Sequence, residues 1–190
     1  NGDPMTGVSI MKLVRKLDAG PLVAQVEAEV RPDDTTGSLS ERLADLSARM
    51  LPDVAREYVA DKRTPVPQDE TLATHTREWS TADAEIDWSQ PARQIERLVR
   101  AANPWPVAWT TDGVTRLRVL AGKVAAGPFA GDQPPGTLSV SAGHVEVATA
   151  DGALVLDLVQ PAGKRGMPAG DWWRGTRRVT TVLGSSPGDE

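Results

Sequence analysis

The sequence predicts an α/β segment that is joined by an extended linker to a small β-barrel. Residues 1–61 contain two strand-like runs and one amphipathic stretch with helical spacing. Residues 81–190 contain a helical stretch and then several short strand-like runs separated by Gly turns. Between them, residues 62–80 are rich in Pro and polar residues without periodicity, which is typical of an extended linker.

The two strands of the first segment flank a Gly-Pro turn. The second run, residues 22–30, alternates apolar and polar side chains, which is the pattern of a half-buried strand. Gly20 and Pro21 lie just before this run, so Asp18 is placed where a sheet opens into a loop. On its own, Asp18 is most simply interpreted as a turn residue whose side chain caps its own backbone.

A helix is expected after the second strand. Ser38 and Glu41 have the spacing of a capping box at its start. Apolar residues then recur at helical spacing up to Met50, and Pro52 predicts a kink or a second helix. A parallel sheet needs crossover units of dozens of residues, so about 60 residues cannot form a complete one. We therefore expect this segment to be the end of a larger α/β domain.

The second domain is expected to begin with a helix. Pro91 lies in its first turn, Ile95 and Val99 mark its buried face, and Glu96 and Arg100 form an i,i+4 pair on its exposed face. Short strands at about ten-residue spacing with Gly turns are typical of a small barrel. The predicted strands cover residues 115–121, 136–140, 145–148 and 154–159.

Two indoles, Trp105 and Trp109, lie in a Pro-rich stretch after this helix. Core packing is the simpler interpretation, because each Trp buries a large apolar area. The alternative is a platform on which nucleobases stack.

Composition excludes several kinds of site. The 190 residues contain no Cys, which excludes disulfides, thiolate zinc sites and a cysteine nucleophile. His75 has no second ligand near it and His144 begins a predicted strand, so no metal site is predicted. No apolar run approaches the length of a membrane span, so no membrane partner is expected.

Charge is unevenly distributed along the chain. The net charge of −5 argues mildly against nucleic-acid binding. A local basic patch nevertheless attracts phosphate even on an acidic protein, although charge alone is more simply interpreted as a solvated tail. Residues 160–180 contain a single acidic residue, Asp171, and the cations Lys164, Arg165, Arg174, Arg177 and Arg178.

Motifs in both halves of the chain resemble the folate-dependent formyltransferases. Leu-Asp-Ala-Gly-Pro at 17–21, preceded by Thr-Gly-Val-Ser-Ile at 6–10, resembles a segment of their catalytic domain. Ile-Asp-Trp at 86–88, Asn-Pro-Trp-Pro at 103–106 and the segment 158–167 resemble, in this order, the C-terminal domain of the methionyl-tRNA formyltransferases.

The resemblance implies a fold and an activity. Residues 1–61 would be the C-terminal remnant of a Rossmann-like catalytic domain, and residues 81–190 an OB-like barrel that helps to bind tRNA. The implied reaction transfers a formyl group from 10-formyltetrahydrofolate to the methionine amine of initiator methionyl-tRNA, in the cytoplasm and by a monomer. A stand-alone nucleic-acid-binding module and a formyltransferase for a nucleotide-sugar amine are the alternatives.

The resemblance also implies site residues. The family's catalytic set is an Asn, a His and an Asp, and the match places the Asp at Asp18. It places the folate co-substrate beside Arg15, Lys16, Leu17 and Asp18, and the tRNA beside Lys164, Arg165, Arg174, Arg177 and Arg178. The family's Asn-x-His and Ser-Leu-Leu-Pro segments do not occur in this chain. We therefore expect a truncated chain that is inactive by itself.

Overall fold

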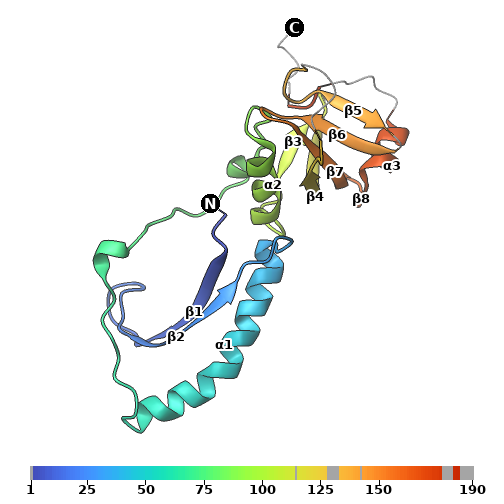
Figure 1. The fold of residues 1–190 in the computed structure, drawn as a ribbon. Helices are drawn as coiled ribbons and strands as arrows, with labels where there is room; N and C mark the ends of the chain where they lie inside the picture. Colours follow the sequence, from blue (N-terminus) through green and yellow to red (C-terminus); the bar gives the residue numbers. More distant parts are fainter. Residues whose placement is uncertain (1, 114, 128–132, 142, 177–181, 185–190) are drawn as a thin grey trace. The chain divides into compact units, whose positions relative to one another are not determined.

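The computed structural model describes residues 2–113, 115–127, 133–141, 143–176 and 182–184. The chain divides into two compact units, residues 1–78 and 79–190. The first unit contains a β-hairpin and a long helix, and the second contains an antiparallel sheet and two helices (Figure 1). Among the described residues there are also two short 3-10 turns, η1 (Glu70–Leu72) in the first unit and η2 (Ala82–Ala84) in the second.

The hairpin of the first unit consists of β1 (Met5–Met11) and β2 (Leu22–Glu29). The strands are antiparallel, and Val8 lies opposite Val26. Along β2, from Ala24 onward, half-buried apolar side chains alternate with exposed polar ones, which confirms the predicted period of two. The helix α1 (Thr36–Val59) contacts both strands.

The capping box of α1 lies one turn earlier than the prediction. Thr35 is the N-cap: its hydroxyl accepts from the Ser38 amide at 3.2 Å, and the Ser38 hydroxyl accepts from the Thr35 amide at 3.0 Å. The preceding Asp34 explains the shift, because its carboxylate accepts from the Arg31 amide at 2.8 Å and from the Ser38 hydroxyl at 3.0 Å. These bonds fix the turn before the helix, so Ser38 becomes its third residue rather than its cap.

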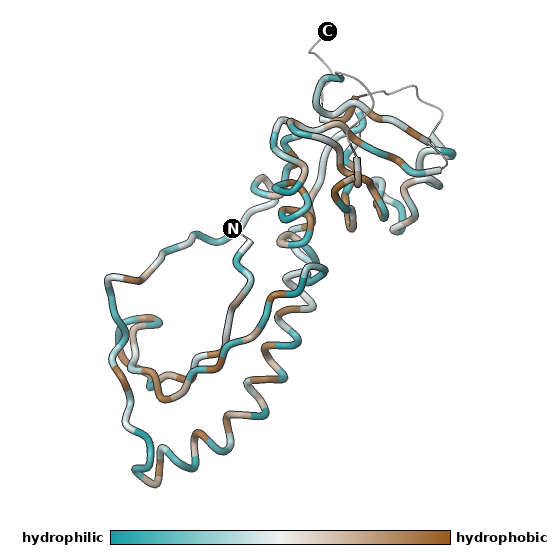
Figure 2. Tube along the Cα trace, in the orientation of Figure 1, coloured by the Kyte–Doolittle hydropathy of each residue, from teal (hydrophilic) through white to brown (hydrophobic). Residues whose placement is uncertain are grey.

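The prediction that Pro52 interrupts the helix is wrong in one respect, because α1 continues through Pro52 to Val59 as a single element. A proline inside a helix removes one N–H donor and leaves the carbonyl four residues earlier without its partner. Here that residue is Ala48, which is exposed, so its carbonyl can be hydrated. Figure 2 shows hydrophobic residues recurring along this helix.

The second unit is built on a six-stranded antiparallel sheet. Its order is β3-β4-β7-β6-β5, and β8 pairs with β7. Four of the strands confirm the prediction, whereas β3 and β8 are too short to show an alternating pattern and were not predicted. The strands are β3 (Trp109–Thr111), β4 (Arg116–Val124), β5 (Leu138–Ser141), β6 (His144–Ala148), β7 (Ala153–Pro161) and β8 (Met167–Pro168).

The helix α2 (Ala92–Ala101) packs on β4 and β7, and its buried face carries Ile95 and Val99 as predicted. The predicted pair of Glu96 and Arg100 is present as an ion pair, but its expected place on an exposed face is wrong, because the side chains of Glu96 and Arg100 are only 16% and 23% exposed. The second helix of this unit, α3 (Ala169–Gly175), contacts β6 and β7. The core of the unit therefore lies between one face of the sheet and α2, with α3 adding Trp172.

The N-terminus of α2 is capped from a distant part of the chain. Pro91 occupies the N-cap, one position before the first turn in which the sequence places it, and it offers no side-chain acceptor. The Asp151 carboxylate, in the turn between β6 and β7, accepts from the Ala92 amide at 2.8 Å. The sheet thus satisfies an amide that would otherwise lack a partner at the start of the helix.

The two indoles of the Pro-rich stretch have different environments. Trp109 is 8% exposed, and its indole N–H donates to the Thr81 carbonyl at 2.7 Å. Trp105 is 61% exposed. Core packing is therefore confirmed for Trp109 and wrong for Trp105.

Two kinds of feature are missing from the described ranges. No helix within them combines the length and the apolar character that crossing a membrane requires. The same residues include no group of three or more His, Asp or Glu side chains placed to hold a metal ion. His144 begins β6, as predicted, and is exposed.

Candidate functional site

Asp18 lines a hollow formed by two segments of the first unit. One segment is the loop between β1 and β2, and the other is the stretch 67–75 from the predicted linker. The hollow has a volume of about 640 Å³. Its polar lining includes Lys16, Asp18, Gln25, Gln68, Glu70 and His75.

Gln68 holds these two segments together. Its side-chain amide donates to the Asp18 carbonyl at 2.8 Å and to the Gly20 carbonyl at 2.7 Å. Next to it, Val66 and Leu22 exchange two backbone hydrogen bonds of 2.8 Å each. The stretch 66–68 is therefore bound to the Asp18 loop, although its composition indicates only an extended chain.

Asp18 has a backbone φ of +53°, in the left-handed region that Asp tolerates better than most residues. Its carboxylate forms no hydrogen bond with any of the described residues, so it does not cap its own backbone as the simple turn interpretation predicts. The side chain is exposed at the hollow. An ionised carboxylate in this position can accept a hydrogen bond from a histidine, an ammonium group or water.

The turn that positions Asp18 requires a glycine at position 20. Gly20 is buried, and a Cβ atom there would lie 1.8 Å from the Lys12 carbonyl oxygen. The Lys12 amide donates to the Pro21 carbonyl at 2.9 Å, which closes the loop at its base. Only a residue without a side chain fits between these two strand ends.

The structure brings together three of the four residues predicted to lie beside the folate. Lys16, Leu17 and Asp18 line the hollow, whereas Arg15 is not part of its lining. The Lys16 ammonium donates to the Glu70 carboxylate at 2.9 Å, and this hydrogen bond is the main reason that the pKa of Glu70 lies below its usual value. The positive charge of Lys16 is therefore partly neutralised by the Glu70 carboxylate.

His75 also lines the hollow, although the sequence offered no functional interpretation for it. Its position depends on the return of the linker onto the Asp18 loop. The sequence itself offers only a histidine within the predicted linker, and its place beside Asp18 becomes clear once the linker is seen to fold back onto that loop.

A second candidate site lies in the other unit, where the predicted tRNA contacts fall. Lys164 and Arg165 are exposed in the turn between β7 and β8, and neither forms an ion pair with a described residue. Arg174, by contrast, is paired with Asp171 within α3. The remaining two, Arg177 and Arg178, lie outside the described residues.

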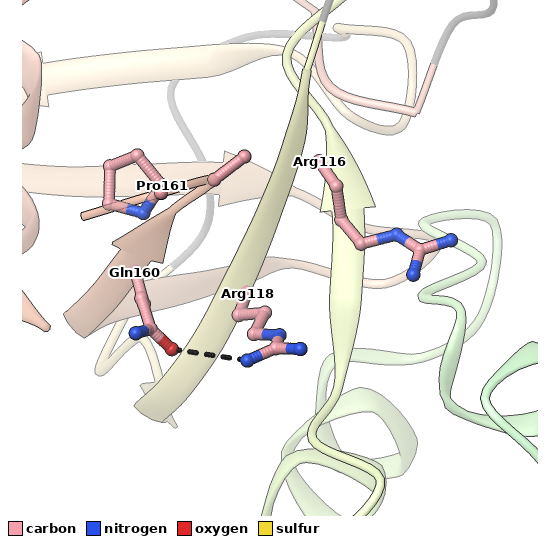
Figure 3. Close-up of a pocket in the computed structure, with 6 residues that line it drawn as sticks. Arg116, Arg118, Gln160 and Pro161 are labelled. Carbon is pink, nitrogen blue, oxygen red and sulfur yellow. Dashed lines mark hydrogen bonds between the residues drawn. The ribbon is translucent and has the colours of Figure 1, made fainter. Parts of the chain in front are cut away.

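Two cations that the sequence analysis missed, Arg116 and Arg118 on β4, lie beside this turn. The strand register places Arg118 opposite Gln160 and Leu117 opposite Pro161. The alternation of Arg with buried residues along β4 was a usable signal, but the partners depend on strand pairing. The resulting pocket has a volume of about 240 Å³, and its lining residues are Arg116, Arg118, Gln160, Pro161, Ala162 and Gly163. Figure 3 is a close-up of this pocket with the first four of them labelled.

Family comparison covers both units. Residues 79–177 match the formyl transferase C-terminal domain, and residues 1–55 match the formyl transferase domain. The chain therefore belongs to the formyl transferase family, which confirms the resemblance inferred from its motifs.

The chain is similar in sequence to several methionyl-tRNA formyltransferases. The methionyl-tRNA formyltransferase of Roseiflexus castenholzii is 49% identical over 177 residues, which cover 93% of this chain and 56% of the relative. The methionyl-tRNA formyltransferase of Thermobifida fusca is 38% identical over 177 residues, with the same two shares. The chain thus spans about half the length of the curated relatives that it matches.

Solved structures show a shared fold. Methionyl-tRNA formyltransferase from Clostridium thermocellum has a TM-score of 0.54 at 18% identity, over 78% of this chain and 58% of that chain. HypX from Aquifex aeolicus in complex with tetrahydrofolic acid has a TM-score of 0.66 at 16% identity, over 90% of this chain and 30% of that chain. At these identities the likeness establishes the fold alone.

Proposed function

We propose that the protein to which this chain belongs is a methionyl-tRNA formyltransferase. It transfers a formyl group from 10-formyltetrahydrofolate to the amino group of methionine on initiator tRNA. One observation carries the proposal: relatives with this name, at identities from 35% to 49%, each match 90% or more of the chain and so include both units. Such an enzyme works in the cytoplasm, and we propose that it acts as a monomer.

The reaction needs more than one kind of group. The methionine amine attacks the formyl carbon of the folate and a tetrahedral oxyanion forms; its collapse breaks the bond from the formyl carbon to the folate nitrogen, which leaves and takes up a proton. Donors must therefore stabilise the oxyanion, and a base must take the amine proton. The Asp18 carboxylate is only an acceptor when ionised, so it can orient and polarise a histidine but cannot stabilise the oxyanion. The Asn and His that complete the family's set are not in this sequence, and the 190-residue chain is therefore inactive alone.

The hollow beside Asp18 is the proposed place of the reacting end of the folate. Two observations support this role. The Asp18 carboxylate at the hollow forms no hydrogen bond with a described residue, and Lys16 and Leu17 line the hollow together with Asp18. A structural neighbour, HypX, is described in complex with tetrahydrofolic acid. The proposal involves no metal ion.

We also propose a fold for each part of the chain. Residues 1–61 are the end of a Rossmann-like catalytic domain, and residues 81–190 are an OB-like barrel that binds tRNA. The short antiparallel strands with Gly turns and the helix α2 over the sheet support the second assignment. Lys164 and Arg165 contact the phosphate backbone, because both are exposed cations in a turn without an acidic partner among the described residues.

The test uses the full-length protein with 10-formyltetrahydrofolate and methionyl-tRNA. Asp18→Asn should lower kcat at least a hundredfold while tRNA affinity stays unchanged, because an amide cannot orient and polarise the histidine, whose acid–base assistance contributes roughly 10²–10⁴-fold. Asp45→Asn, at an exposed position of α1, is the matched control and should leave kcat unchanged. Formyl transfer to a nucleotide-sugar amine but not to methionyl-tRNA would overturn the proposal. Transfer by the 190-residue chain alone would contradict its inactivity.

A further inference from the structure

The outer face of β4 carries two arginines beside the turn that follows β7. Leu117 and Val119 are fully buried, so the alternating residues Arg116 and Arg118 project from the opposite face, where both are exposed. The Ala162 amide donates to the Arg116 carbonyl at 3.2 Å. This bond holds the turn against the beginning of β4, so that the two form one pocket.

Neither guanidinium is neutralised by an acid in the described part of the chain. Arg118 donates to the neutral amide oxygen of Gln160 over a long 3.5 Å (Figure 3). The guanidinium carbon of Arg116 lies 3.8 Å from the centroid of the Trp109 ring, a cation–π contact that orients the group without cancelling its charge. Most of the N–H donors of the two arginines are therefore available to a ligand.

We propose that Arg116 and Arg118 bind phosphate groups of the tRNA backbone. The inference rests on the proposed function, which supplies the RNA. A planar guanidinium binds phosphate oxygens through two parallel hydrogen bonds, which an ammonium cannot do. The pocket of about 240 Å³ is far larger than the roughly 10–15 Å³ that one water molecule needs by the same kind of measure. A phosphate with part of its ribose fits a space of this size.

The arrangement of the neighbouring cations favours a polymer over a small phosphate. Gln160 accepts from Arg118, and its own amide donates to the Lys164 carbonyl at 2.9 Å. One side chain therefore links the arginine pocket to the turn that carries Lys164 and Arg165. Together with Arg116 and Arg118 these are four exposed cations on β4 and the turn bonded to it, and an extended polyanion can neutralise several of them at once. Such contacts position the RNA and carry no base specificity.

The experiment measures the affinity of the full-length protein for an initiator tRNA transcript over a salt series. The variants are Arg118→Gln, Arg118→Lys and the double variant Arg116→Gln/Arg118→Gln. The matched control is Lys123→Gln, which also removes one positive charge from β4 but at a lysine that pairs with Asp157 at 3.3 Å. Thermal unfolding of each variant establishes that it is folded. The single variant Arg118→Gln leaves the cation–π contact between Arg116 and Trp109 intact, so its effect on binding does not include the loss of that contact.

Each lost phosphate contact should reduce the salt slope of log K by about one. The double variant should bind roughly tenfold or more weakly at low salt, since a hydrogen bond to a charged group is worth about 1.5–3 kcal/mol. Arg118→Lys should keep the salt slope but lose affinity, because a lysine keeps the positive charge but lacks the planar guanidinium that donates two parallel hydrogen bonds. Lys123→Gln should match the wild type.

Three outcomes would overturn the inference. The first is a folded double variant with the wild-type salt slope, and the second is an equal effect of Lys123→Gln. The third is displacement of the RNA by millimolar inorganic phosphate in the wild type alone, which would assign the pocket to a small phosphate. Formyl transfer is measured separately. A protein that binds tRNA through these arginines but does not formylate it refutes only the proposed function.

Discussion

The interaction between Gln68 and the Asp18 loop gives a quantitative prediction for the variant Gln68→Ala. The wild-type amide donates to an exposed carbonyl, that of Asp18, and to a partly buried one, that of Gly20. A neutral hydrogen bond contributes about 0.5–1.5 kcal/mol net, with exposed bonds at the low end, so losing both should cost about 1–2 kcal/mol. This loss raises the population in which the stretch 66–68 is detached by roughly 5- to 30-fold.

Hydrogen exchange of the Val66 and Leu22 amides is the direct assay, because these two amides bond across the junction at 2.8 Å each. Their exchange should accelerate by the same factor in Gln68→Ala. The control is Gln25→Ala, which removes a single exposed hydrogen bond to Ser9 and should leave both amides unchanged. Equal exchange rates in Gln68→Ala and the control would refute the reasoning, because the backbone pairing would then hold the linker without the side chain.

Two further predictions concern stability. Trp109→Ala should lower the free energy of unfolding by about 3–5 kcal/mol, because its ring is buried, whereas Trp105→Ala should cost under about 1 kcal/mol as an exposed residue; equal shifts in the urea midpoint would contradict this. The pKa of Asp34 is lowered, chiefly by the hydrogen bond from the Arg31 amide and also by Ser38 and Arg42. The ionised form is therefore favoured in the folded state, so the stabilisation is present above the unfolded pKa of about 3.9 and is lost as the pH falls through the lower folded value. Asp34→Asn should flatten the stability profile below about pH 4, and parallel profiles for the variant and the wild type would show that Asp34 is not responsible.

Features that depend on local sequence were predictable. The period of two along β2 and the buried face of α2 follow from the spacing of apolar residues, since one face of each element meets a core. The pair Glu96–Arg100 follows from the pitch of a helix. Asp18 was found through its motif, and the structure adds that its carboxylate is not engaged by any described residue.

Features that depend on long-range pairing were not predictable. Nothing near Gln68 in the sequence indicates that it binds the carbonyls of Asp18 and Gly20, which lie 50 and 48 residues away. The pocket of Arg116 and Arg118 likewise depends on the register between β4 and β7. The N-cap of α1 is Thr35 rather than the expected Ser38 for a related reason. The hydrogen bonds of Asp34 fix the preceding turn, so the capping box is Thr35–Ser38 and not Ser38–Glu41.

The cap of α2 has a consequence for the synthesis of the protein. Ala92 leaves the ribosome 59 residues before Asp151, the acceptor that caps its amide. At roughly 5–20 residues per second, the helix waits about 3–12 s for that partner. A helix of this length is marginal in water without tertiary contacts, so α2 becomes stable only after the turn between β6 and β7 has emerged. Ribosome-bound chains that end before this turn should therefore remain sensitive to proteases throughout the second unit, and those that end well after it should gain protection in a single step.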